Sequence, residues 1–108
     1  MRRKRVFSLI TLLCFALAVV AAGKRFTLVI DAGHGGGDNG APGAYSNEKD
    51  LTLKYALAFG RYVERNCPDV KVIYTRTTDI FVTLAGRADI ANRNKADLFL
   101  SFHINAIT

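Results

Sequence analysis

The feature that most constrains the fold is a regular alternation of short apolar runs with longer segments of helical periodicity. The apolar runs at 26–30, 70–75 and 98–102 have the length and composition of β-strands. The two segments between them, 48–66 and 84–94, repeat apolar residues at helical spacing. Strands that alternate with helices in this way form a parallel sheet with right-handed connections. We therefore predict an α/β fold: a three-layer sandwich with a mostly parallel sheet and helices on both faces.

The strand order follows from the burial that each predicted strand requires. The first and third strands are apolar enough to be buried on both faces, whereas the second alternates around Lys71 like a strand with one solvated face. The second strand is therefore predicted at an edge, which gives the spatial order 2-1-3 and places the two helices on opposite faces. In open sheets of this kind, ligands bind at the carboxyl ends of the strands where the order reverses. We expect a binding site beyond the ends of the first and third strands.

Breaker and capping residues set the limits of these elements. The segment 33–43 contains six glycines and one proline, so we predict a loop there. Asn47 is predicted to cap the first helix and Thr83 the second, because both side chains can accept a hydrogen bond from a free backbone N–H group. Pro68 prevents the first helix from continuing.

The second predicted helix has one face that suits the interior. Leu84, Ala88 and Ala91 recur at helical spacing and are expected on its inner side. Arg87 and Arg93 are interpreted as ordinary structural residues of the same helix.

The chain has two histidines, and both fall at the predicted binding edge. His34 comes shortly after the first strand, and His103 directly follows the third. Neighbouring strands lie about 4.8 Å apart, so both imidazoles should emerge over the same edge. Glu48, at the start of the first helix, can point back toward them. Two histidines and one carboxylate suit Zn²⁺ and leave a fourth coordination position for water. The metal would lower the pKa of that water and would polarise a carbonyl group, as amide hydrolysis requires.

Other interpretations of these residues stay open at this level. Histidines near strand ends are often surface or capping residues, and Glu48 in a first helical turn can simply favour the helix dipole. Gly35–Gly40 also matches the G-x-G-x-x-G pattern of a dinucleotide-binding site. In such a site the helix begins within the motif, whereas helical periodicity here begins only near Glu48. A dinucleotide-binding domain is therefore the remote alternative.

Residues 1–23 have the organisation of an export signal. Four basic residues at positions 2–5 precede an uncharged apolar run, which ends in the small residues Ala22 and Gly23. We predict that this signal is removed and that the remaining domain, 24–108, is exported to the periplasm or cell envelope. A retained membrane anchor is the alternative, because the apolar run is close to the minimum length of a membrane span. We expect no other association with a membrane.

Most of the net charge of +6 belongs to this leading segment. The remaining chain has eleven basic and nine acidic residues, whereas folded nucleic-acid-binding domains carry a basic face. We therefore predict no nucleic-acid partner. Cys14 lies inside the predicted signal, so Cys67 has no intrachain disulfide partner in the exported domain. Cys67 is predicted to pack at the end of the first helix.

Four motifs, in the same order and at family-like intervals, carry a resemblance to a known enzyme family. They are Ile30–Gly36 (IDAGHGG), Asn47–Leu51 (NEKDL), Tyr74–Arg76 (YTR) and Ser101–Ala106 (SFHINA). With these motifs, residues 26–108 resemble the zinc-dependent N-acetylmuramoyl-L-alanine amidases of the amidase-3 type. The resemblance implies that the substrate is peptidoglycan, which is cut at the amide between the lactyl group of N-acetylmuramic acid and L-alanine of the stem peptide.

The resemblance also implies roles for individual residues. It implies three zinc ligands: His34, Glu48 and His103. Three further residues match recurrent family positions and are expected to support the site: Asp31, Arg76 and Asn105.

One feature of the family has no counterpart in this sequence. Family members supply a further glutamate near the C-terminus of the domain as general acid and base. This chain has two glutamates, of which Glu48 is assigned to the metal. Glu64 lies about 24 Å farther along the predicted helix. We therefore expect residues 24–108 to be the N-terminal part of an amidase domain, with the catalytic glutamate beyond residue 108. General acid–base catalysis contributes about 10²–10⁴-fold in rate, so this part alone should be inactive or very weak. The alternative is a non-catalytic zinc- or peptidoglycan-binding module.

Overall fold

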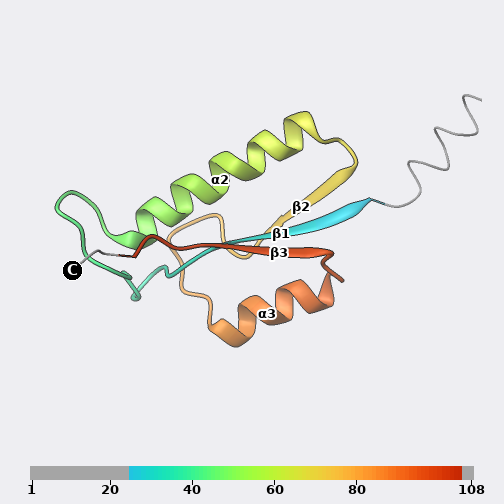
Figure 1. The fold of residues 1–108 in the computed structure, drawn as a ribbon. Helices are drawn as coiled ribbons and strands as arrows, with labels where there is room; N and C mark the ends of the chain where they lie inside the picture. Colours follow the sequence, from blue (N-terminus) through green and yellow to red (C-terminus); the bar gives the residue numbers. More distant parts are fainter. Residues whose placement is uncertain (1–24, 106–108) are drawn as a thin grey trace, which may run out of the picture.

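Three parallel strands and two helices form the part of the chain that the computed structural model describes, residues 25–105. In chain order the elements are β1 (Phe26–Ala32), α2 (Glu48–Asn66), β2 (Val70–Tyr74), α3 (Leu84–Arg93) and β3 (Leu98–Phe102). The sheet has the order β2-β1-β3, and the two helices lie on opposite faces of it (Figure 1). The predicted fold class and strand order are confirmed. The predicted export signal at 1–23 lies outside the described residues.

β1 is the central strand and carries most of the core. It pairs in parallel with β2 on one side and with β3 on the other. Leu28 and Ile30 are buried in a cluster with Ala56 and Val63 of α2. Successive side chains of a strand point to opposite faces, so Asp31 points away from this cluster, toward α3. One face of β1 is therefore an apolar core, while the other carries a buried charge.

The strand register places the carboxyl ends of β1 and β3 side by side. Ala32 lies opposite Phe102, and the N–H of Gly33 continues the ladder by donating to the carbonyl of Phe102 at 3.0 Å. The chain therefore leaves both strands at the same edge, where His34 and His103 follow.

α2 begins at the predicted residue, but its cap differs from the prediction. Asn47 occupies the N-cap position with extended backbone, and its side chain makes no capping hydrogen bond. The glycine-rich loop provides the acceptors instead: the N–H of Glu48 donates to the carbonyl of Ala41 at 2.9 Å, and the N–H of Lys49 donates to the carbonyl of Asn39 at 3.1 Å. Backbone carbonyls thus replace the predicted side-chain cap and fix the loop to the start of the helix.

The end of α2 agrees with the prediction. Cys67, just before Pro68, is half-buried against the core, and its N–H donates to the carbonyl of Val63 at 2.8 Å. Its thiol is free. Within residues 25–105, no helix combines the length and the apolar character needed to cross a membrane.

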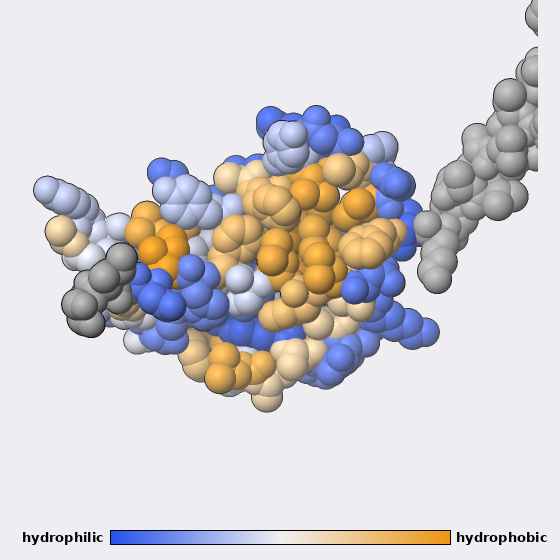
Figure 2. Space-filling model, viewed as in Figure 1, coloured by the Kyte–Doolittle hydropathy of each residue, from blue (hydrophilic) through white to orange (hydrophobic). Residues whose placement is uncertain are grey.

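The prediction that β3 and the inner side of α3 are buried is wrong within the described residues. Thr83 caps α3 as predicted, by accepting from the N–H of Gly86. Leu84, however, is 84% exposed, and Leu98 and Phe99 of β3 are 49% and 40% exposed. The reason is that β3 pairs on one side alone here, so its outer edge contributes to a broad apolar area that extends over α2 (Figure 2).

Candidate metal centre at the carboxyl ends of two strands

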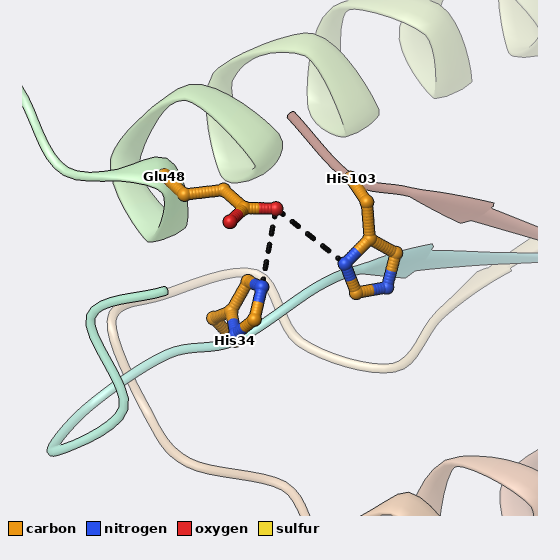
Figure 3. Close-up of side chains that lie close together, drawn as sticks. All are labelled: His34, Glu48 and His103. Atoms are coloured by element: carbon orange, nitrogen blue, oxygen red, sulfur yellow. Dashed lines mark ion pairs between the residues drawn. The ribbon is translucent and has the colours of Figure 1, made fainter. Parts of the chain in front are cut away.

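Three side chains from distant segments converge at the carboxyl edge of the sheet (Figure 3). His34 follows β1, Glu48 is the first residue of α2, and His103 directly follows β3. His34 Nε2 and His103 Nδ1 lie 3.1 Å and 3.5 Å from the same Glu48 oxygen, Oε2. One potential ligand atom from each residue lies within 4.8 Å of the other two. The fold thus brings together the three residues that the sequence singled out.

Backbone donors hold Glu48 in place. Glu48 is 4% exposed. Its Oε1 accepts from the N–H of Ala41 at 2.9 Å, and its Oε2 accepts from the N–H of Ile104 at 2.8 Å. Burial raises the pKa of Glu48, but the two backbone donors and His34 lower it by more than burial raises it. The pKa of Glu48 therefore lies below its usual value. The side chain is therefore an ionised carboxylate aimed at both histidines.

His34 has an unusual backbone conformation and a second carboxylate partner. Its φ of 64° lies in the left-handed region, which is uncommon outside glycine and is found at functional sites. Its Nδ1 lies 2.9 Å from Oδ2 of Asp38. The hydrogen bond with His34 holds the pKa of Asp38 below its usual range. The ring of His34 therefore lies between two carboxylates, one at each nitrogen.

Two glycines let the backbone approach the histidine rings. A Cβ on Gly33 would lie 2.5 Å from Cε1 of His103. Gly40 has a φ of 66°, and a Cβ there would lie 2.7 Å from Cδ2 of His34 and 2.8 Å from Cβ of Glu48. Both contacts are too short for any other residue type, so these glycines are required by the packing of the site.

The donor set fits a zinc ion. A tetrahedral zinc with bonds of about 2.0–2.2 Å to nitrogen and oxygen separates neighbouring donor atoms by about 3.4 Å. The two distances from Glu48 to the histidines, 3.1 Å and 3.5 Å, bracket that separation. The side chain of His103 is 45% exposed, which leaves the site open on one side, as a zinc with a fourth, exchangeable ligand requires.

An apolar groove of about 370 Å³ opens beside the two histidines. His34 and His103 line it together with Phe81, Val82 and Leu84. The groove gives a molecule from solvent access to the open side of the three converging side chains.

Arg76, a predicted support residue, holds the start of the glycine-rich loop against α2. It is 3% exposed. Its Nε donates to the carbonyl of Ala32 at 2.9 Å, and its Nη2 donates to the carbonyls of Gly33 and Lys49 at 3.0 Å and 2.9 Å. The hydroxyl of Thr52 donates to the same Gly33 carbonyl at 2.7 Å. These bonds fix the backbone between β1 and His34.

Asp31, a second predicted support residue, links β1 to β3, to Thr75 directly after β2 and to α3. Its carboxylate accepts from the hydroxyls of Thr75 and Ser101 at 2.6 Å each and pairs with Nη1 of Arg87 at 2.7 Å. Burial raises the pKa of Asp31, but the donors from Ser101, Thr75 and Arg87 outweigh it, so its pKa lies below the usual value. Arg87 in turn donates from Nη2 to the carbonyl of His34 at 2.8 Å.

Asn105, the third predicted support residue, lies apart from these bonds. It is exposed, and its side chain makes no hydrogen bond within residues 25–105. The preceding residue, Ile104, contacts the site through its backbone N–H. A supporting role for Asn105 stays a prediction.

Sequence reasoning missed two residues that contact His34. Arg87, interpreted above as an ordinary structural residue of the helix, is 4% exposed and binds the backbone of His34. Asp38 binds the ring of His34. The spacing of Asp38, four residues after His34 in a glycine-rich turn, was a usable signal, whereas nothing local indicates the burial of Arg87.

Glu64 is engaged elsewhere, as its place in the sequence predicted. The hydroxyl of Tyr74, at the end of β2, donates to Oε1 of Glu64 at 2.8 Å. Burial and the neighbouring Glu64 carboxylate raise the pKa of Tyr74 to about 12. Both glutamates of the chain therefore have defined structural partners, Glu48 at the candidate metal centre and Glu64 beside β2.

The glycine-rich segment does not form a dinucleotide-binding turn. α2 begins at Glu48, well after Gly35–Gly40. The N–H groups of Glu48 and Lys49, which a pyrophosphate would need, are bound to carbonyls of the loop itself.

Comparison with known proteins gives consistent matches. Residues 28–108 match the Amidase_3 family, described as N-acetylmuramoyl-L-alanine amidase. The sporulation-specific N-acetylmuramoyl-L-alanine amidase of Bacillus subtilis is 43% identical over 79 residues, which cover 73% of this chain and 31% of the relative. The N-acetylmuramoyl-L-alanine amidase AmiC of Escherichia coli is 42% identical over 86 residues, which cover 79% of this chain and 20% of the relative.

A solved structure supports the same relationship. The N-acetylmuramoyl-L-alanine amidase of Clostridium difficile 630 superposes with a TM-score of 0.74 at 38% identity, covering 80% of this chain and 47% of that structure. The chain thus spans a third or less of the length of the two curated relatives and about half of the solved structure.

Proposed function

Because this chain belongs to the Amidase_3 family of N-acetylmuramoyl-L-alanine amidases, we propose that it takes part in the zinc-dependent hydrolysis of peptidoglycan. The bond cut is the amide between N-acetylmuramic acid and L-alanine of the stem peptide. Residues 24–108 form the N-terminal part of the catalytic domain in this proposal. The observation that carries it is the convergence of two imidazoles and one buried carboxylate at donor spacings suited to zinc.

In this proposal three side-chain atoms would hold the metal: Nε2 of His34, Nδ1 of His103 and Oε2 of Glu48. Bound zinc would supply Lewis acidity toward the amide carbonyl and would lower the pKa of a coordinated water toward neutrality. The backbone donors to Glu48 hold its carboxylate rigid. The groove lined by Phe81 and Val82 would offer an apolar surface to the substrate beside the two histidines.

Proton transfer to the leaving amine needs a group that residues 25–105 do not provide in this geometry. Glu48 faces both histidines, and Glu64 accepts from Tyr74 beside β2. We assign the general acid–base role to a glutamate that follows residue 108 in the full-length protein. Loss of such a group lowers an amide hydrolysis rate by about 10²–10⁴-fold, so residues 24–108 alone are proposed to be inactive or very weak.

The substrate implies where the protein acts. Peptidoglycan lies outside the cytoplasmic membrane, so the proposal includes export to the periplasm or cell envelope. Residues 1–23, with four basic residues before an apolar run, have the composition of the signal that directs such export.

The proposed activity is tested with the full-length protein and purified peptidoglycan in the presence of zinc. Hydrolysis at the proposed bond releases stem peptides with a free L-alanine amino terminus, which mass spectrometry identifies. H34A and H103A should abolish release, while K71A, which alters an exposed residue of β2, should not. Release of glycan fragments with intact stems, or full activity in both histidine variants, would contradict the proposal.

A non-catalytic zinc- or peptidoglycan-binding module is the second candidate. It is favoured by one observation: neither glutamate of the chain is free to transfer a proton. Such a module would bind zinc and co-sediment with peptidoglycan without releasing stem peptides. The same release experiment therefore separates the two functions.

A further inference from the structure

His34 carries a carboxylate at each of its two ring nitrogens. Oδ2 of Asp38 lies 2.9 Å from Nδ1, and Oε2 of Glu48 lies 3.1 Å from Nε2. Glu48 is shared with His103, whereas Asp38 contacts the ring of His34 alone. The two carboxylates therefore have different relationships to the candidate metal centre.

The position of Asp38 is fixed by the backbone around it. Its N–H and carbonyl form a reciprocal pair with Gly35, with N–O distances of 3.0 Å and 2.8 Å. Its second carboxylate oxygen, Oδ1, accepts from the N–H of Gly40 at 3.1 Å. One oxygen is thus held by the loop, and the other is aimed at the ring of His34.

An imidazole that binds a metal must offer a nitrogen without a proton, while its other nitrogen keeps one. An ionised carboxylate can only accept a hydrogen bond. A carboxylate beside Nδ1 therefore favours the tautomer that has its proton on Nδ1, and this leaves Nε2 free to bind a metal. Nε2 is the nitrogen of His34 that faces Glu48 and His103.

We propose that Asp38 is a positioning residue that holds the Nδ1–H tautomer and the ring orientation of His34, so that Nε2 is presented to zinc. This inference rests on the proposed zinc site. Carboxylates in this relationship to a metal-binding histidine change metal affinity by about 10–100-fold when they are removed.

Asp79 provides a matched control for Asp38. The two side chains have similar exposure, 46% and 51%. Each accepts from one N–H of the glycine-rich loop, Gly40 for Asp38 and Gly36 for Asp79. The partner of Asp79 is Lys49 rather than a histidine. Replacing either residue removes a hydrogen bond to the loop. Of the two replacements, only that of Asp38 also removes a contact with the ring of His34.

The test measures the zinc dissociation constant of the chain and of three variants by competition with a chelator. D38A should bind zinc about 10–100-fold more weakly than the wild type. D38N keeps an acceptor oxygen and should recover part of that loss. D79A should bind zinc within about threefold of the wild type, because Asp79 contacts neither imidazole.

A second readout reports on the tautomer itself. In the zinc-loaded wild type, NMR should show a protected Nδ1–H proton on His34, and this signal should be lost by exchange with water in D38A and kept in D79A. Unchanged zinc affinity in D38A, or an equal loss in D79A, would overturn the role of Asp38 and leave the zinc site standing. Absence of zinc binding in the wild type would instead overturn the proposed function and this inference with it.

Discussion

Asp31 and Arg87 form an ion pair of 2.7 Å although both side chains are almost completely buried, at 3% and 5% exposure. The pair joins the central strand to α3, and Arg87 also binds the carbonyl of His34. Removing one partner of a buried pair leaves the other without a counter-charge in a poorly solvated place. The pair therefore links the stability of the fold to the backbone that carries one candidate ligand.

We expect R87A to lower the free energy of unfolding by about 3–5 kcal/mol, because Asp31 would be left buried without its counter-ion. R93A is the matched control on the same helix, since Arg93 pairs with Asp89 at 68% and 60% exposure. Exposed pairs of this kind contribute about 0.2–1 kcal/mol. Urea denaturation of the two variants measures the difference. Equal losses of unfolding free energy would contradict the larger contribution assigned to the buried pair.

The network around Asp31 also predicts a dependence on pH. Burial raises the pKa of Asp31, and the donors from Ser101, Thr75 and Arg87 lower it more, so its pKa in the folded state lies below the ordinary value of 3.8. The stabilisation is therefore fully present above the unfolded-state pKa and is lost as the pH falls through the folded-state pKa.

In S101A one of these donors is removed, so the pKa of Asp31 in the folded state should rise toward its unfolded-state value. The acid-induced loss of stability should then be smaller than in the wild type and should end at higher pH. Urea denaturation between about pH 6 and pH 3, the range around the ordinary carboxylate pKa, follows this change. S46A serves as control, because Ser46 lies in the loop before α2 and does not contact Asp31. The same acid profile in S101A and wild type would contradict the assigned network.

Gly40 and Gly37 lie in one loop but differ in what a side chain would meet. A Cβ at Gly40 would clash with His34 and Glu48, and its φ of 66° disfavours any side chain, by about 1–2 kcal/mol for the conformation alone. A Cβ at Gly37 would meet nothing within 4 Å. G40A should therefore weaken zinc binding sharply while G37A leaves it unchanged. Isothermal titration with zinc compares them, and wild-type affinity in G40A would contradict the packing described for the site.

The two helix caps make a further pair of matched substitutions. The hydroxyl of Thr83 accepts from the N–H of Gly86 at 2.9 Å, so T83A should cost about 1 kcal/mol of stability. N47A should cost much less, because the Asn47 side chain makes no capping bond. Thermal or urea denaturation distinguishes them, and a larger loss in N47A would reverse this assignment.

Much of the fold could be predicted because its signals are local. Helical periodicity and Pro68 defined α2, and the contrast between the alternating strand at Lys71 and the apolar strands gave the order β2-β1-β3. That order alone brought His34 and His103 to one edge. Topology therefore accounts for the approach of the histidines. The place of Glu48 at the start of the first helix made it their candidate partner, and the family resemblance implied the same three residues.

The features that could not be predicted depend on contacts between distant segments. The cap of α2 comes from carbonyls of Ala41 and Asn39, whose positions depend on the folded loop. The burial of Arg87 depends on Asp31, which lies on another element. The exposure of β3 depends on which strands are beside it rather than on its own composition.

The zinc content of the chain after dialysis against buffer with a trace of zinc tests the metal centre most directly. We predict one zinc per chain in the wild type and in the loop variant D79A, and little or none in H34A, E48A or H103A. Each variant is checked for folding by circular dichroism, so that loss of metal is not confused with loss of structure. Stoichiometric zinc retained by folded H34A and H103A would contradict the claim that these three residues form one metal centre.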